Sequence, residues 1–140
     1  MFKSMAELLS PAEIGDFKID IFNIETDNIA AIFQGIRPGQ YARLKQDDEC
    51  IMSDTDMEKR TNRMFVARAR GDVLIGGLGI GMVIMAIQDD PTVRSITVVE
   101  KHQEVIDLVT NQLHFNEKVK IICADVFDWK PDTGKKYDSI

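Results

Sequence analysis

The sequence predicts an α/β protein in which a small β-rich region with one helix precedes a parallel sheet with helices on its faces. Residues 1–70 contain short stretches in which apolar and polar side chains alternate. Residues 71–140 contain β-branched runs that are separated by helical segments of about ten residues. Strands that alternate with helices favour right-handed crossovers and a parallel sheet. We therefore expect a boundary near Gly71, with a β-rich region at 1–70 and a second domain at 71–140.

The first region is predicted to begin with short strands. Residues 17–21 alternate apolar and polar side chains at period two, which is typical of a half-buried strand. The pair Pro38-Gly39 suits the centre of a type II turn. Because residues 29–33 and 41–44 flank that turn, we expect them to form a hairpin. Residues 50–52 are a further short apolar run and a further predicted strand.

A helix is predicted to end the first region. Asp54 or Thr55 can cap its start, its first turn is acidic, and its last turn is basic, which complements the helix dipole. Gly71 stands where a helix C-terminal glycine belongs. The helix and its end also carry a run of basic residues, for which a solvated face is the simplest interpretation and a phosphate-facing or RNA-facing role the alternative: Lys59, Arg60, Arg63, Arg68 and Arg70.

The second region repeats a strand–helix order. Its apolar runs predict three strands with two helices between them, at residues 72–75, 96–99 and 119–123 for the strands and 81–88 and 104–113 for the helices. Residues 137–140 resemble the start of a fourth strand. Cys123 ends the third strand, which we expect to be central, so its thiol should be buried.

A glycine-rich loop between the first of these strands and its helix is the strongest functional signal. Residues 76–81 contain G-x-G-x-G at Gly77, Gly79 and Gly81, which allows a sharp turn and the close approach of a ligand. Glu100 ends the next strand about twenty residues on, where a carboxylate can accept both hydroxyls of a ribose. Asp125 closes the third strand at the same edge. This order predicts a nucleotide-type site at the carboxyl ends of the strands.

Each of these residues also has a structural interpretation. The glycines could form a tight strand-to-helix turn that packs on a neighbouring segment. Glu100 alone could be a solvated carboxylate, and Asp125 alone could cap the turn that follows it. The combination of the loop with acidic residues after two successive strands favours a ligand site.

Four segments together resemble class I S-adenosylmethionine-dependent methyltransferases, and within them the spermidine-synthase-like branch: Val73–Gly81, Val98-Val99-Glu100, Ala124-Asp125-Val126-Phe127 and Tyr137-Asp138. The resemblance implies a Rossmann-like sheet behind a small β-rich domain, with S-adenosyl-L-methionine as cofactor. It implies that the three glycines of the G-x-G-x-G motif approach the methionine part and that Glu100 holds the ribose. Asp125 would meet the adenine amino group, and Lys101 and Val126 would flank the adenine ring.

The chain also departs from this branch. Aminopropyl-transferring members carry an acidic residue inside the glycine loop, and residues 76–81 contain none. The catalytic and substrate-binding aspartates of the branch follow the fourth strand, beyond Ile140, so no catalytic residue is assigned. A complete sheet has seven strands, and only about four fit here. We therefore expect the chain to be a C-terminally truncated form of the fold.

The resemblance implies an S-adenosylmethionine-dependent transferase, and a methyltransferase first. Whether these 140 residues are catalytic by themselves is left open. The alternatives are a non-catalytic S-adenosylmethionine-binding or assembly module, a relative of the polyamine aminopropyltransferases, and an NAD-type oxidoreductase. The last would need a glycine at position 82, which is Met82.

Composition and charge exclude several other classes. The net charge of −6, from 17 basic and 23 acidic residues, argues against nucleic acid or an anionic membrane as the main partner. The uncharged run that begins at Val73 is shorter than the ~20 residues of a membrane span. Two cysteines cannot form a disulfide framework, which favours a reducing, cytoplasmic location. His102 and His114 have no third ligand at metal spacing, so no metal site is expected.

Self-association is a further expectation. A sheet that stops in a fourth strand at Tyr137–Ile140 would leave the glycine-loop strand near an open edge and would uncover apolar side chains. We therefore expect copies of the chain to form a homo-oligomer, with two-fold symmetry as the commonest case.

Overall fold

The first half of the chain forms an antiparallel sheet with three helices around it. The computed structural model describes residues 1–140. The sheet has the order β1-β2-β3-β4, and its strands are β1 (Ala12–Ile14), β2 (Phe17–Ile24), β3 (Gly39–Gln46) and β4 (Glu49–Ser53). The helices are α1 (Met5–Leu8) before the sheet, α2 (Ile29–Phe33) between β2 and β3, and α3 (Asp56–Arg68) after β4.

The second half forms a parallel sheet of the order β5-β6-β7. Its elements follow one another as β5 (Gly71–Gly76), α4 (Met82–Ile87), β6 (Val93–Glu100), α5 (Gln103–Thr110) and β7 (Val119–Cys123). Both strand pairs are parallel, with Ile75 opposite Val98 and Val98 opposite Ile121. The predicted α/β class is therefore confirmed, and the Rossmann-like unit contains the glycine loop between β5 and α4.

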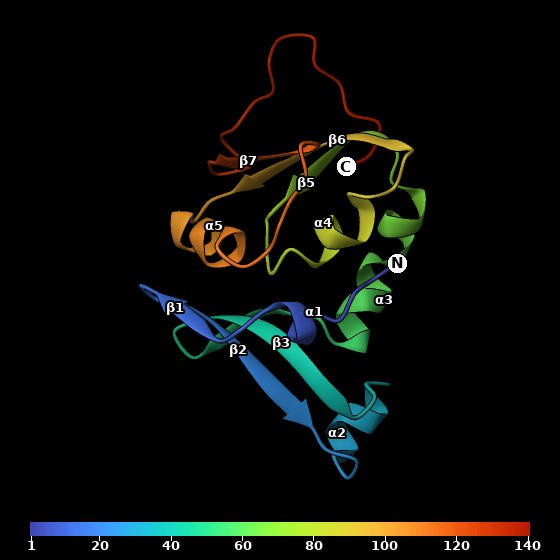
Figure 1. The fold of residues 1–140 in the computed structure, drawn as a ribbon, viewed down its shortest axis with the longest axis vertical. Coiled ribbons are helices and arrows are strands. Elements are labelled where there is room, and N and C mark those ends of the chain that lie inside the picture. The colour runs from blue at the N-terminus through green and yellow to red at the C-terminus, as the bar shows by residue number, and fades with distance from the viewer.

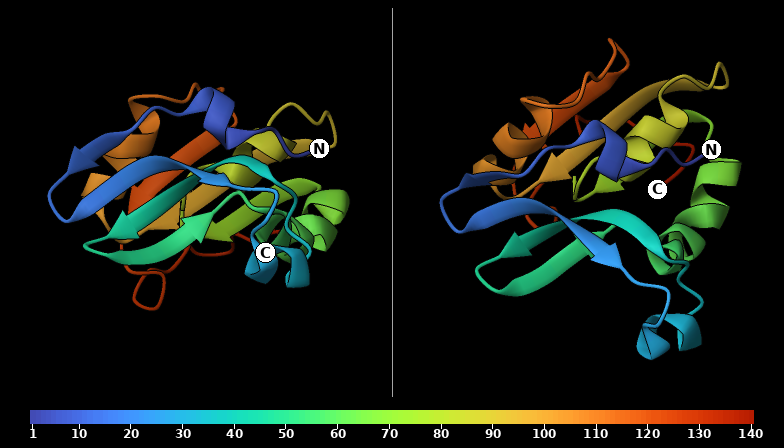
Figure 2. Two further views of the ribbon diagram at one scale, coloured as in Figure 1. Left: turned by 90° about the horizontal axis from the view of Figure 1, so that it is seen from below. Right: turned by 60° about the horizontal axis from the view of Figure 1, so that its bottom comes forward.

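The two halves share one hydrophobic core. Figures 1 and 2 show α4 and α5 between the two sheets, with the antiparallel sheet on one side of these helices and the parallel sheet on the other. A single cluster of 21 buried residues draws on both halves, with Ile19 and Leu44 from the antiparallel sheet and Val98 and Leu108 from the parallel unit. The boundary near Gly71 is thus crossed by continuous packing, and the division into two domains stays a prediction.

The predicted hairpin at 29–44 is wrong. Residues 29–33 form α2 instead of a strand, and the side chain of Asn28 caps this helix by accepting a hydrogen bond from the Ala31 N–H at 3.0 Å. This cap outweighs the apolar run that suggested a strand. β3 pairs with β2 and β4, and Figure 2 shows α2 at the far end of the antiparallel sheet. The short helix α1 was also not predicted, so the first half has three helices rather than one.

The glycine at position 71 has another role than the one expected. Helix α3 ends at Arg68, and Ala69 caps it with extended backbone. Gly71 is the first residue of β5, with φ of +63°, and a Cβ at this position would overlap the carboxylate of Asp138. The glycine therefore permits a close approach between β5 and the segment near residue 138.

The fourth strand is present as a single bridge. Ser139 pairs in parallel with Val73, and its carbonyl accepts a hydrogen bond from the Leu74 N–H at 2.9 Å. Its place beside β5 is the predicted one. β7 is an edge strand rather than a central one, so the expected burial of Cys123 is wrong and its side chain is exposed. None of the helices has the length and apolarity needed to cross a membrane.

Candidate functional site

The glycine loop turns the chain from β5 into α4 with left-handed backbone at all three motif glycines. Their φ angles are +96° at Gly77, +56° at Gly79 and +79° at Gly81. Such angles favour glycine whatever the surroundings. The turn predicted from the sequence therefore has a direct conformational reason.

The space beside the three glycines differs. A Cβ at Gly77 would meet no atom within 4 Å, so this position borders open space. A Cβ at Gly79 would overlap the sulfur of Met52, which belongs to β4 in the other sheet. A Cβ at Gly81 would lie 2.8 Å from Cδ1 of Leu113. Gly77 alone leaves room for a ligand beside its Cα, and the other two glycines allow close packing within the protein.

Glu100 binds the glycine loop directly. Its carboxylate ends β6, is 8% exposed, and accepts a hydrogen bond from the Leu78 N–H at Oε2, at 2.8 Å. The His102 N–H donates to Oε1 at 3.1 Å. A carboxylate oxygen can accept a second hydrogen bond. Glu100 therefore orients the loop and still has acceptor capacity for a ligand.

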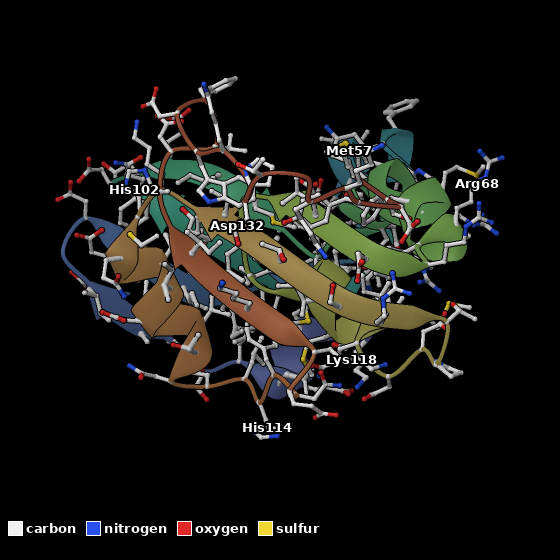
Figure 3. All side chains as sticks on the ribbon, turned by 90° about the horizontal axis from the view of Figure 1, so that it is seen from above. Met57, Arg68, His102, His114, Lys118 and Asp132 are labelled. Carbon is white, nitrogen blue, oxygen red and sulfur yellow. The ribbon has the colours of Figure 1, made fainter.

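A cavity of about 790 Å³ lies between the two sheets at this point. One wall is the parallel unit, with Gly76 to Gly79, Glu100 and His102. The other wall includes β4 and the adjacent face of α3, with Met52 and Glu58 among its residues, and parts of β2 and β3. The volume lies in the range of roughly 300–1,000 Å³ that is typical of small-molecule sites. Figure 3 shows His102 on the opposite side of the molecule from Arg68 of α3.

The charged groups that line this cavity are all acidic. Its walls include the carboxylates of Glu49, Glu58 and Glu100 and contain no lysine or arginine. Carboxylates accept hydrogen bonds from hydroxyl and amino groups, and a group of them attracts cations. The cavity is therefore suited to a small molecule with hydroxyl groups or positive charge.

Four of the predicted site residues lie outside these walls: Gly81, Lys101, Asp125 and Val126. The Asp125 Oδ2 is 3.7 Å from Nζ of Lys101, and its Oδ1 accepts a hydrogen bond from the Phe127 N–H at 2.9 Å. Cγ2 of Val126 lies 3.6 Å from the position that a Cβ on Gly76 would take. Asp125 thus caps its own turn, and Val126 lies over the start of the loop.

The second wall could not be anticipated from motifs. Its residues come from β4 and α3, where Cys50, Ile51 and Met52 form a plain apolar run, and Thr61 and Asn62 lie on a polar helix. They reach the loop only because the antiparallel sheet packs against the parallel unit. No local pattern in the sequence signals that contact.

Three solved structures are similar to this chain. A spermidine synthase from Thermotoga maritima has a TM-score of 0.50 at 19% identity, over 84% of this chain and 40% of that chain. A spermidine synthase in complex with the transition-state analogue AdoDATO has 0.49 at 19%, over 82% and 39%. The plantazolicin methyltransferase BpumL in complex with SAH has 0.42 at 20%, over 56% and 29%. No family model and no curated protein matches the chain.

The likeness to the Thermotoga maritima structure covers most of this chain, although the chain spans only two fifths of that protein. At such identity the likeness concerns the fold and not the activity. The likeness extends over both halves of this chain, because 84% of the chain is more than either half. The sequence resemblance likewise implies a β-rich first half and a parallel unit with a glycine loop. The chain has a Rossmann-like α/β fold that is similar to the fold of that spermidine synthase.

Proposed function

We propose that the cavity between the two sheets binds S-adenosyl-L-methionine and that the chain is a transferase domain, in the first place of a methyltransferase. One observation carries the proposal. Glu100 is a buried carboxylate at the end of β6 that holds the glycine loop and faces a cavity. A purely solvated strand-end carboxylate would have neither property.

The residues of the cavity fit this cofactor. The remaining acceptor sites of Glu100 suit the two hydroxyls of a ribose. The open space beside Gly77 lets the backbone approach a ligand. The three glutamates would stabilise the positive charge of a sulfonium. Each of these features concerns a different part of the same molecule.

The remaining predicted residues take their roles from the resemblance. Asp125 would accept a hydrogen bond from the adenine amino group, and Lys101 and Val126 would flank the ring. Gly79 and Gly81 would shape the loop around the methionine part, since their own Cα positions face Met52 and Leu113.

When bound, S-adenosylmethionine would supply an electrophilic methyl group for transfer to a nucleophile, with its thioether product as the leaving group. The part of this chain is to bind, to orient and to exclude water, because positioning accounts for most of the rate in such a transfer. Glu100 fixes the sugar relative to the loop. β4 and α3 close the cavity from the other side.

Calorimetric titration tests the proposal. We expect S-adenosylmethionine and S-adenosylhomocysteine to bind, and Glu100→Gln to weaken both by ~1.5–3 kcal/mol, the usual cost of losing a charged hydrogen-bond partner. Glu117→Gln is the matched control, because Glu117 is exposed and lies outside the cavity. A folded parent chain that binds neither compound would contradict the proposal.

Two further ligands separate the alternatives. NAD in place of S-adenosylmethionine would indicate an oxidoreductase. Decarboxylated S-adenosylmethionine, bound much more tightly than S-adenosylmethionine itself, would indicate an aminopropyltransferase. Equal loss of binding in the Glu100 and Glu117 variants would show that general charge, rather than the loop carboxylate, attracts the ligand.

A further inference from the structure

Helix α3 lines a second cavity with its opposite face. Glu58, Thr61 and Asn62 belong to the cavity described above, whereas Lys59, Arg60 and Arg63 line a separate one of about 770 Å³. Arg37, from the segment between α2 and β3, also lines this second cavity. The two cavities share no lining residue. Three residues of the basic run, Lys59, Arg60 and Arg63, therefore border an open cavity rather than a flat surface.

The Arg60 guanidinium is held in place by neutral partners. Its Nη2 donates to the carbonyl of Gln34 at 2.5 Å, and its Nη1 donates to the carbonyl of Gly35 at 3.1 Å. Gly35 has φ of +69°, and a Cβ there would lie only 3.2 Å from Nη1 of Arg60. The glycine thus leaves the space that the guanidinium occupies. Because both partners are carbonyls, the positive charge of Arg60 is oriented but not neutralised.

The acidic residues of this second cavity are already engaged. Asp56 forms an ion pair with Arg37, with 2.9 Å between Oδ1 and Nη2, and this pairing lowers the pKa of Asp56 to about 2. Asp90 accepts hydrogen bonds at Oδ1 from the N–H and the hydroxyl of Thr92. Lys59 and Arg63 form no side-chain hydrogen bond or ion pair. Lys59, Arg60 and Arg63 are therefore not paired with an anion, while Asp90, whose partners on Thr92 are neutral, is the one acidic group of the lining that keeps an unpaired charge.

Apolar side chains complete the lining. Phe2 and Val66 are half-buried and border the same space as the three cationic groups. Guanidinium groups match the geometry of phosphate oxygens, and neighbouring apolar surface favours a ligand that also carries an organic body. We propose that this second cavity binds a small phosphate-bearing molecule. Arg60, Arg63 and Lys59 bind its phosphate groups, and Phe2 and Val66 contact its organic part.

Binding of inorganic pyrophosphate and of ribose 5-phosphate, measured by calorimetry in 150 mM salt, tests this site on the intact chain. Pyrophosphate contains neither adenine nor a ribose, so it does not report on the proposed cofactor site, and ribose 5-phosphate is titrated with that site saturated by S-adenosylhomocysteine. We expect both to bind, and Arg63→Gln and Lys59→Gln each to weaken pyrophosphate by about tenfold, the cost of one charged hydrogen bond. Lys18→Gln and Lys120→Gln are matched controls, since both lysines are outside the cavity and the charge change is the same. Thermal melts establish that the variants are folded.

The outcomes separate this site from the cofactor site. Binding of pyrophosphate that survives Glu100→Gln and saturating S-adenosylhomocysteine supports a separate site, whether or not the cofactor proposal holds. Equal weakening in the α3 variants and the controls overturns it, because diffuse charge would then explain the binding. It is also overturned if pyrophosphate fails to bind while a single-stranded oligonucleotide binds more tightly with length, which would make this face a nucleic-acid surface.

Discussion

The two halves of the molecule use the same device with different results. In the antiparallel half, Asp54 is 1% exposed and accepts hydrogen bonds from the N–H groups of Met5 and Ala42, at 2.8 and 2.7 Å. In the parallel half, Glu100 is also buried and also accepts two backbone hydrogen bonds. Glu100 borders the cavity between the two sheets, and Asp54 is not among the residues that line this cavity. A buried carboxylate with backbone partners is therefore a structural element in one half, and in the other it is available for a ligand as well.

The largest effect should come from Asp54→Ala. Removing the carboxylate leaves the Met5 and Ala42 N–H groups buried without an acceptor, so we expect a loss of about 3 kcal/mol in the free energy of unfolding. Urea denaturation measures it. Asp48→Ala, at an exposed position, should change stability by less than about 0.5 kcal/mol. Each buried unpaired group costs about 1–3 kcal/mol. A loss below about 1 kcal/mol for Asp54→Ala would therefore mean that Asp54 is not a structural carboxylate of the kind compared here with Glu100.

The next largest loss of stability should come from the contact between Gly79 in the parallel half and Met52 in the antiparallel half. Gly79→Ala should cost about 2 kcal/mol, because alanine is strained in left-handed backbone and its Cβ would displace Met52. In Met52→Ala the same glycine substitution should cost about 1 kcal/mol less, since contacting residues couple. A double-mutant cycle in urea measures this. If the losses of stability from the two substitutions simply add, the contact between β4 and the glycine loop does not contribute to stability.

A smaller change in stability is expected for Glu100→Gln. The amide keeps one acceptor oxygen for a backbone N–H, so we expect a loss of about 1 kcal/mol, well under that of Asp54→Ala. Thermal unfolding of the two variants side by side compares the two carboxylates. A larger loss for Glu100→Gln than for Asp54→Ala would mean that Glu100, rather than Asp54, is the carboxylate on which the stability of the fold depends more.

The smallest expected effect is the pH dependence of stability that the ion pair between Arg37 and Asp56 produces. The Arg37 guanidinium lowers the pKa of Asp56 to about 2 from its ordinary 3.8. A carboxyl group with a lowered pKa stabilises the fold above its unfolded pKa, and this contribution disappears as the pH falls from 3.8 towards 2. Arg37→Gln should therefore be less stable than the parent at pH 6, and the difference should shrink as the pH falls through about 2, the pKa of Asp56 in the fold. A difference that is constant over this range would assign the effect to something other than Asp56.

Local signals predicted the parallel half well. The β-branched run at 119–123 is β7 to the residue, and the acidic end of β6 and the glycine loop lie where the spacing placed them. These features depend on neighbours in sequence. Asn28 shows the limit of such reasoning, because its capping of α2 outweighed an apolar run that resembled a strand.

The second cavity wall could not be predicted in this way. Met52 and Gly79 are neighbours only after two sheets have packed together, and neither carries a motif that names the other. The same holds for Asp54, whose partner Met5 lies 49 residues away. The sequence therefore predicted the loop and its carboxylate, but not the wall that closes the cavity around them.

The shared core has a consequence for synthesis on the ribosome. The N–H of Ser10 donates to Oε1 of Gln112 at 2.6 Å, across 102 residues of chain. The antiparallel sheet emerges first, yet the helix that covers Phe17 and Ile19 lies near residues 103–110. Until α5 has left the exit tunnel, those apolar side chains lack the cover that α5 provides, and exposed apolar surface on a nascent sheet favours aggregation. We expect ribosome-bound chains that stop near residue 90 to recruit a chaperone, and longer ones that include α5 to release it.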